Sequence, residues 1–287
     1  MSDAVKNGNV NPKDTEIAFF GGSFTAIDRD YMLSLLIAAK PFTEIFSGIR
    51  ISTRPDYIDN EILNILKSFN VTAVELGAQS MDDTVLTANE RGHSSKDVIE
   101  ASKLIKSYGF NLGLQMMTGL YKSTVPKDIY TAKKFIEISP STVRIYPTVI
   151  MKDTPLATLY QNGKFIPYTL EQSVDLCAEL ISMFENAGIN IIRLGLHYSD
   201  SLKDNSLGNN YHPAFKELCE NKIFYNEFLQ TVKNINKQSP FTVFINEKSL
   251  SKFLGQKKSN INKFEKYGYK FDIKFDNTLG KYNLYIK

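Results

Sequence analysis

Polar side chains and glycines interrupt a series of apolar segments, and these residues are the best candidates for chemistry. Gly21 and Gly22 follow the first segment, and adjacent glycines let a backbone approach a ligand closely. The polar and small residues of the next four segments are Ser52, Thr53 and Arg54, then Glu75, Gly77, Gln79 and Ser80, then Gln115 and Thr118, and finally Arg144 and Tyr146. Each alone can be a structural hydrogen-bonding group, but five successive segments that carry such groups predict a polar pocket.

The three histidines do not form a metal site in the sequence. His93, His197 and His212 have no partner at the spacing of zinc ligands. His93 lies in a loop after the third apolar segment and is the best functional candidate among them. A loop histidine that caps a backbone group is the more common case, and both interpretations stay open. No metal ligand is therefore assigned.

The two cysteines, Cys177 and Cys219, fit no zinc, haem or cluster pattern. Both lie among helix-forming residues, so we expect buried and inert thiols. So few thiols indicate a reducing compartment, and we expect a cytoplasmic protein. No run of eighteen apolar residues predicts a membrane helix. Residues 1–13 are polar, do not resemble a signal peptide, and are interpreted as a linker or a truncation scar.

Apolar segments alternate with amphipathic ones along most of the chain. The segments expected to be strands are 17–24, 48–55, 71–80, 111–120, 142–150 and 189–199, and the expected helices are 30–39, 60–69, 95–108, 126–138 and 170–187. Ser95 and Thr169 are predicted N-caps, of which only Thr169, with Gln172, forms a capping box. Gly109 and Gly188 occupy C′ positions.

This alternation predicts a parallel sheet covered by helices. No GxGxxG follows the first strand, which favours a barrel over an open dinucleotide-binding sheet. We therefore expect an α/β fold, a partial TIM-type β/α barrel over residues 14–232, with the polar residues at the carboxyl ends of its strands.

Residues 233–287 differ in charge and pattern from the body. They contain twelve Lys, no Arg and four acidic residues, a net of +8, and the whole chain sums to +3, so the remainder is −5. Strands at 241–246, 269–277 and 281–287 around a helix at 248–267 predict a small basic α+β domain of βαββ order. Alternation at Phe271, Ile273 and Phe275 predicts a half-exposed antiparallel strand with a turn at 277–280. The charge indicates either a contact with nucleic acid or a lysine-rich solvated surface.

Six blocks of the sequence resemble a known family. They are AFFGGSFTAID, IRISTRPDYID, VELGAQSMDDTVL, NERGH, GLQMMTGL and VRIYPTVI, within residues 17–213. Together they resemble the radical S-adenosylmethionine proteins related to the Elongator catalytic subunit and to oxygen-independent coproporphyrinogen oxidase. Members cleave S-adenosylmethionine reductively to a 5′-deoxyadenosyl radical that abstracts hydrogen from a substrate. The resemblance implies that activity here, on an unidentified substrate that can be a tRNA.

The resemblance also implies roles for individual residues. Gly21, Gly22, Ser23 and Phe24 match the segment that meets the amino group of S-adenosylmethionine. The other implied cofactor contacts are Ser52, Thr53, Arg54, Glu75, Gly77, Gln79, Gln115 and Arg144. Tyr146 and His93 are the implied substrate contacts.

One departure from the family concerns the [4Fe–4S] cluster. The family holds it with three closely spaced cysteines before the GG segment, whereas no cysteine here precedes Cys177. We expect the cluster, and an electron donor, in a full-length protein, with no cluster ligand in this chain, which would then be inactive alone. Truncation and a natural cluster-free relative are the two explanations. Loss of a first barrel strand predicts an exposed sheet edge and self-association through it.

The basic tail contains LSKFLGQKKSNINKFEK, residues 250–266. This segment resembles the GxxG loop and following helix of KH domains, with Lys258 in place of the second glycine. By that resemblance Lys252, Lys257, Lys258 and Lys263 would contact RNA phosphates. Two other functions stay open: a non-catalytic RNA- or nucleotide-binding protein with a degenerate barrel, and an unrelated barrel enzyme with acid–base chemistry at Glu75 or His93.

Overall fold

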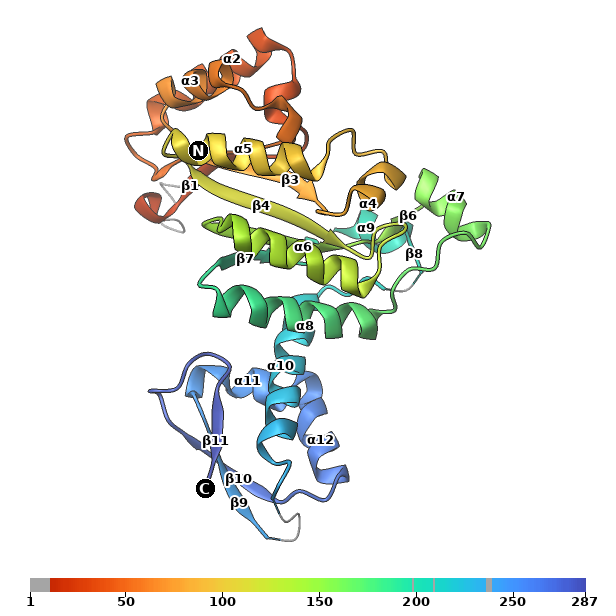
Figure 1. Ribbon diagram of the computed structural model, residues 1–287. Helices are drawn as coiled ribbons and strands as arrows, with labels where there is room; N and C mark the ends of the chain where they lie inside the picture. Colours follow the sequence, from red (N-terminus) through yellow and green to blue (C-terminus); the bar gives the residue numbers. More distant parts are fainter. Residues whose placement is uncertain (1–10, 198, 209, 236–238) are drawn as a thin grey trace. The chain divides into compact units, whose positions relative to one another are not determined.

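A six-stranded sheet forms the first part of the fold. The computed structural model describes residues 11–197, 199–208, 210–235 and 239–287. The strands are β1 (Glu16–Phe19), β2 (Gly48–Thr53), β3 (Val71–Gln79), β4 (Asn111–Thr118), β5 (Thr142–Pro147) and β7 (Asn190–Leu194), in that spatial order (Figure 1). The pairings from β1 to β5 are parallel. The sheet curls into a half-barrel, which confirms the predicted partial β/α barrel.

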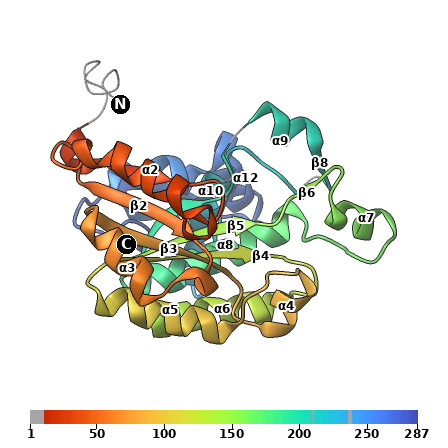
Figure 2. The ribbon, with the colours of Figure 1, turned by 90° about the horizontal axis from the view of Figure 1, so that it is seen from above.

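Helices alternate with these strands, five of them close to the predicted positions, whereas the short helix Asp83–Ala88 was not predicted. They are α2 (Arg29–Ala39), α3 (Asn60–Ser68), α4 (Asp83–Ala88), α5 (Ser95–Ser107), α6 (Val125–Ile138) and α8 (Leu170–Asn186), with 3-10 turns at Pro12–Asp14, Phe24–Ala26, Lys40–Phe42 and Pro55–Tyr57. Figure 2 shows α5 and α6 together along one side of the sheet. Their apolar stripes face the strands, which leaves the opposite face of the sheet free of these helices.

Side-chain caps explain where several helices begin. The predicted N-cap Ser95 was wrong by one residue, because Ser94 caps α5 and the Ser94 amide donates in turn to the Asp97 carboxylate. This capping box was therefore missed. The Thr169–Gln172 box is confirmed by reciprocal bonds of 2.9 and 3.1 Å. Gly109 follows α5 with a φ of 83°, in the left-handed region where glycine is favoured.

Alternation along the strands separates two faces of the sheet. Ile49 and Ile51 of β2, like Val74 and Leu76 of β3, are fully buried on the helix-covered face. Polar side chains occupy the other face, here called the inner face. The polar residues were expected at the carboxyl ends of the strands. This was wrong for Glu75, which is the fifth of the nine residues of β3 and so lies in the middle of the strand.

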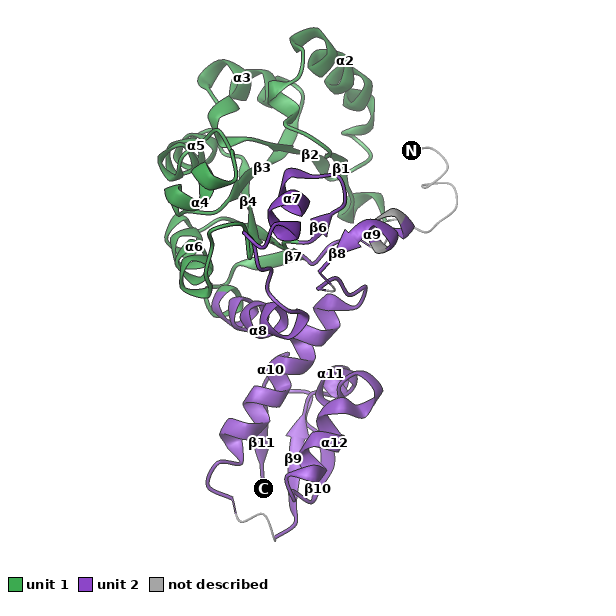
Figure 3. Ribbon diagram, turned by 90° about the vertical axis from the view of Figure 1, so that its right-hand side faces the viewer, with its two compact units in different colours: residues 1–148, 184–193 green, residues 149–183, 194–287 purple. Residues whose placement is uncertain are grey.

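The chain divides into two compact units (Figure 3). The first contains residues 1–148 and 184–193, and the second contains 149–183 and 194–287. The second unit includes an antiparallel pair, β6 (Ile150–Met151) and β8 (Ser206–Leu207), and the helices α7 (Pro155–Gln161), α9 (Asp200–Asn205) and α10 (Phe215–Thr231). Strand β7 ends at Leu194, so His197 does not lie on the last strand as predicted.

The C-terminal elements form a three-stranded sheet of order β10-β9-β11. The strands are β9 (Phe241–Ile245), β10 (Phe271–Phe275) and β11 (Leu284–Ile286), with a 3-10 turn at Glu247–Ser249 and the helices α11 (Leu250–Leu254) and α12 (Ser259–Lys266). The expected antiparallel arrangement of β10 was wrong, because β10 runs parallel to β9. Only β11 is antiparallel to it.

The single helix predicted over 248–267 is interrupted. Gly255 has a φ of 76° and ends α11. Lys257 and Lys258, in the 3-10 turn Gln256–Lys258, have φ of 53° and 59°, so the backbone cannot continue as an α-helix. Phe224 and Phe228 of α10 are part of the hydrophobic core of these C-terminal elements. The residues that form this core therefore start before residue 233, where the small domain was predicted to begin.

Two further predictions concern surfaces. Among the described strands, β1 pairs only with β2, which leaves an open edge on the sheet; self-association through that edge stays a prediction. No helix in the described part of the chain is long and apolar enough to cross a membrane.

Candidate functional site

A buried carboxylate is the centre of the inner face. The Glu75 side chain is 1% exposed and accepts hydrogen bonds from two guanidinium groups. Arg144 donates from Nε and Nη2 at 2.7 and 3.2 Å, and Arg50 donates from Nη1 at 3.1 Å. Gln115 Nε2 donates to the same carboxylate at 2.9 Å. These four residues are here called the Glu75 network.

Strand register produces this network. Glu75 lies beside Ser52 of β2 and Gly113 of β4, and Gln115 lies beside Arg144 of β5. A Cβ atom on Gly113 would be 2.6 Å from Glu75 Cγ, so only glycine leaves room for the carboxylate at this position. Laterally paired residues of a parallel sheet point to the same face, and the polar groups of four strands therefore meet.

Sequence reasoning missed Arg50, which completes the charge balance. Its Nε donates to Glu16 at 2.6 Å while its Nη1 reaches Glu75. Two half-buried arginines therefore face two carboxylates. Burial lowers the pKa of Arg144, but the hydrogen bonds and charge of Glu75 outweigh burial and raise that pKa above its ordinary value. The position of Arg50 two residues before Ser52 was the available signal, because it places both on one face.

The Glu75 carboxylate is fully engaged by its partners. Both oxygens accept bonds from positively charged groups, and Gln115 occupies a further lone pair. Gln115 also donates to Ser52 Oγ at 2.9 Å, which fixes the amide orientation. A carboxylate held in this way orients other groups and is not free to take a proton from a substrate, which argues against acid–base chemistry at Glu75.

An open backbone segment follows β1. A Cβ atom on Gly21 or Gly22 would have no heavy atom within 4 Å, and Gly21 has a φ of 112°. Phe20, just before them, is 49% exposed, and the guanidinium carbon of Arg144 lies 4.5 Å from its ring centre. Ser23 makes no capping bond. The space around both glycines is therefore open, and the cofactor contact expected there stays a prediction.

Three predicted cofactor contacts lie away from the Glu75 network. Phe24 is buried and stacks on Phe19 with ring centres 4.8 Å apart. Thr53 points to the opposite face from Ser52 and shares a 2.6 Å hydroxyl bond with Thr25. Arg54 donates twice to Asp56, at 2.9 and 2.6 Å, and this bonding raises the pKa of Arg54. These side chains stabilise the loops after β1 and β2.

The loop after α4 carries a half-buried cation, Arg91, that the predicted residue set omitted. Arg91 Nη2 lies 3.1 Å from Met117 Sδ, and Arg91 Nε is buried without a hydrogen-bond partner. No carboxylate among the described residues pairs with it. Burial and the positive charge of Arg54 lower the pKa of Arg91. A half-buried guanidinium without an acid is a good site for an anionic ligand.

His93, Gly77, Gln79 and Tyr146 occupy or follow the carboxyl ends of strands. His93 Nε2 lies 3.1 Å from the Ala78 carbonyl oxygen, while Nδ1 is buried and unpartnered. A Cβ atom on Gly77 would be 2.9 Å from Gln79 Nε2, and Gln79 has a φ of 64°. Tyr146 is half-buried on β5 and contributes a hydrogen bond that raises the pKa of Arg144.

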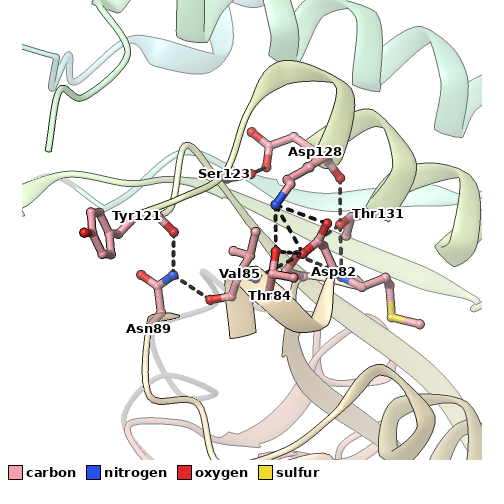
Figure 4. Close-up of polar contacts among 11 residues, drawn as sticks. Asp82, Thr84, Val85, Asn89, Tyr121, Ser123, Asp128 and Thr131 are labelled. Atoms are coloured by element: carbon pink, nitrogen blue, oxygen red, sulfur yellow. Dashed lines mark hydrogen bonds and ion pairs between the residues drawn. The ribbon is translucent and has the colours of Figure 1, made fainter. Parts of the chain in front are cut away.

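A second set of polar contacts fastens the loops that carry these groups (Figure 4). Asn89 Nδ2 donates to the Val85 and Tyr121 carbonyl oxygens at 2.7 and 2.8 Å, and so joins the loop after α4 to the loop after β4. Asp128 accepts bonds from Ser123 Oγ at 2.6 Å and from the Gly119 amide at 2.9 Å. The Arg91–His93 loop is therefore anchored.

The residues of this chain do not fit a three-cysteine cluster site. The sequence holds two cysteines, Cys177 and Cys219, and both are free, buried and in the second unit. Burial and a hydrogen bond with Cys177 raise the pKa of the Cys219 thiol far above its ordinary value. In the part of the chain that the structure describes, no three His, Cys, Asp or Glu residues are placed to hold a metal ion.

The fold and the polar inner face define a class of protein. Residues 2–136 match the family model for the radical SAM superfamily, and residues 140–224 match that for the Radical_SAM C-terminal domain. The two matches together cover most of the chain, which belongs to the radical SAM superfamily.

Within that superfamily the chain is similar to Elongator-type proteins, as the sequence motifs predicted. It is 33% identical over 132 residues to tRNA uridine(34) acetyltransferase of Methanocaldococcus infernus, which is 44% of this chain and 24% of that protein. It is 32% identical over 190 residues to Elongator complex protein 3 of Homo sapiens, which is 58% of this chain and 35% of that protein. These matches span about a quarter and about a third of the two relatives.

A solved structure shares the fold. The archaeal Elp3 of M. infernus with an N-terminal deletion superimposes with a TM-score of 0.60 and 25% sequence identity. The match covers 70% of this chain and 55% of that chain.

Proposed function

We propose that the inner face of the half-barrel binds S-adenosylmethionine, as the radical SAM part of a tRNA-modifying enzyme. The observation that carries this proposal is the buried, charge-balanced Glu75 network beside an open glycine segment. When bound, S-adenosylmethionine supplies the 5′-deoxyadenosyl group that the superfamily uses.

The donor set fits the polar groups of this ligand. Arg91 has an unpaired buried Nε that suits a carboxylate. The exposed backbone at Gly21 and Gly22 offers carbonyl oxygens to an ammonium group. Ser52 and Gln115, braced by Glu75, supply neutral hydrogen-bonding groups on the inner face.

The cluster is a different case. A family site takes three thiolates, and this chain has two cysteines, both buried in the second unit. No reductive step is therefore assigned to residues of this chain. Binding of S-adenosylmethionine and binding of tRNA are each testable without one.

The tRNA part of the proposal is supported by the names of the relatives and by the C-terminal cations. Lys257 and Lys258 are exposed and lack a carboxylate partner among the described residues. Their left-handed backbone presents both at the turn before α12. Lys252 lies 3.4 Å from Glu220 and over the Tyr282 ring, so its cation is already paired, and its contact with RNA stays a prediction.

Calorimetric titration with S-adenosylmethionine tests the first part. Arg91→Gln is expected to weaken binding by roughly tenfold or more, since hydrogen bonds to charged groups contribute about 1.5–3 kcal/mol. Arg29→Gln, which removes an exposed arginine paired with Glu61, is the matched control and should bind as the unaltered chain does. Absence of binding by the unaltered chain would refute the proposed ligand.

Salt-dependent tRNA binding tests the second part. The pair Lys257→Gln and Lys258→Gln should lower the slope of log affinity against log salt by about 2, one phosphate contact for each lysine. The pair Lys270→Gln and Lys274→Gln makes the same charge change on and beside β10 and should leave the slope nearly unchanged. Equal slopes in the two pairs would remove the turn before α12 from the RNA contact.

A further inference from the structure

The second unit contains a cleft whose lining residues lie outside the Glu75 network. Its volume is about 370 Å³, within the range of pockets that take small ligands. Residues of α8, α10 and α12 line it. All of them belong to the second unit, in which α12 lies beside α10 (Figure 1).

Asn221 is the unusual residue of this cleft. It lines the cleft, is 4% exposed, and neither Nδ2 nor Oδ1 has a hydrogen-bond partner. The adjacent Asn260 differs, because its Nδ2 is used by the fold and donates to the Asn221 and Phe253 carbonyl oxygens at 2.8 and 3.2 Å. The fold therefore fixes the Asn221 backbone and leaves its side-chain amide unused.

An unused buried amide selects a class of ligand. It offers a donor and an acceptor side by side, and buried polar groups of this kind are nearly always paired in native proteins. Nucleobase edges present the complementary acceptor and donor, and Asn pairs with adenine in this way. A purely apolar ligand would leave the amide unsatisfied.

The rim of the cleft adds an aromatic ring and a cation. The Tyr225 hydroxyl bonds the Tyr267 hydroxyl at 2.9 Å, which fixes the ring and raises the pKa of Tyr225 to about 12. Lys222 and Lys263 lie 5.2 and 5.1 Å from the Tyr225 ring centre. Lys222 is paired with Asp175 at 2.8 Å, whereas Lys263 has no carboxylate partner among the described residues. Lys263 is thus available for a phosphate.

We propose that this cleft receives one unpaired base of an RNA, read by the Asn221 amide, with the neighbouring phosphate at Lys263. The proposal rests on the proposed tRNA binding and deepens it, because it adds a base-reading position to the phosphate contacts of Lys257 and Lys258. A base held in a cleft must come from a single-stranded loop or end, since bases in a duplex are stacked and paired.

Anisotropy titration of the full chain with a labelled single-stranded oligoribonucleotide tests the proposal. Asn221→Leu removes the donor and the acceptor at similar volume and should weaken binding roughly tenfold, because one paired base edge contributes about that factor or more. Asn226→Leu makes the same change at an exposed position of α10 and should leave affinity within about twofold. Lys263→Gln should weaken binding and lower its salt dependence, whereas Lys266→Gln should not.

The outcomes separate the two proposals. If the unaltered chain binds no RNA, the proposed tRNA function fails. If it binds RNA and Asn221→Leu, folded by circular dichroism, binds equally well, only the cleft proposal is overturned. Adenosine monophosphate tests whether the base in the cleft comes from RNA. If the mononucleotide competes with RNA, and Asn221→Leu abolishes this competition, the cleft proposal is supported. If the mononucleotide binds in an Asn221-dependent way but RNA does not, RNA is overturned as the occupant.

Discussion

Replacement of Glu75 by glutamine should strongly destabilise the half-barrel. The carboxylate is 1% exposed and compensates two guanidinium groups that are themselves only 11% and 16% exposed. Glutamine keeps the shape but removes the charge and turns an NH₂ group toward a cation. Arg50 retains its bond to Glu16, so the uncompensated charge is mainly that of Arg144. Loss of one partner of a buried ion pair costs about 3–5 kcal/mol, and the retained Glu16 contact places the expected loss near about 3 kcal/mol.

Urea denaturation followed by far-ultraviolet circular dichroism measures this loss. At about 2–4 °C per kcal/mol for a domain of this size, the thermal midpoint should also fall by roughly 6–12 °C. Glu61→Gln is the control, because Glu61 is 72% exposed and its pair with Arg29 contributes at most about 1 kcal/mol. If Glu75→Gln were no less stable than Glu61→Gln, the charge compensation deduced here would be incorrect.

Two other predictions concern single positions of the first unit. Gly113→Ala should weaken S-adenosylmethionine binding and lower stability by about 1–3 kcal/mol, because the new Cβ displaces the Glu75 side chain; calorimetry and urea denaturation measure both, and unchanged values would contradict the close approach. Asp97→Asn should remove about 1 kcal/mol of stability near neutral pH by loss of the α5 capping box. Bonds from Ser94 hold the pKa of Asp97 below its ordinary value, so this stability is present above about pH 4 and is lost as pH falls. Asp97→Asn should therefore make stability depend less on pH in the acid range. An unchanged acid dependence would contradict this role of Asp97.

Local pattern was sufficient for most of the first unit. The alternation of apolar strands and amphipathic helices predicted the six strands of the sheet and the helices α2, α3, α5, α6 and α8, because each buries one face and repeats at its own period. The short elements α4, β6 and α7 were missed. The Thr169 cap was predicted at its own residue, whereas the cap of α5 was predicted only to within one residue, since Ser94 and Ser95 have the same capping chemistry and Asp97 decides between them.

The C-terminal sheet shows a limit of such patterns. Alternation at Phe271, Ile273 and Phe275 identified a strand, but both parallel and antiparallel strands alternate with a period of two. The direction follows from the connection: α11 and α12 carry the chain back so that β10 enters the sheet parallel to β9. The helix break at Gly255 was marked in sequence only by the glycine itself.

The sequence by itself determined the family, the order of the elements and the identity of most polar residues on the inner face. Tertiary structure alone decided which of them act together. Glu75 and Arg144 are 69 residues apart and meet through the register of three adjacent strands. Adjacent residues of a strand point to opposite faces, so Ser52 joins Gln115 whereas Thr53 turns to Thr25. Whether a polar group is paired or left without a partner, as at Arg91 and Asn221, depends on packing between distant segments, which no local pattern records.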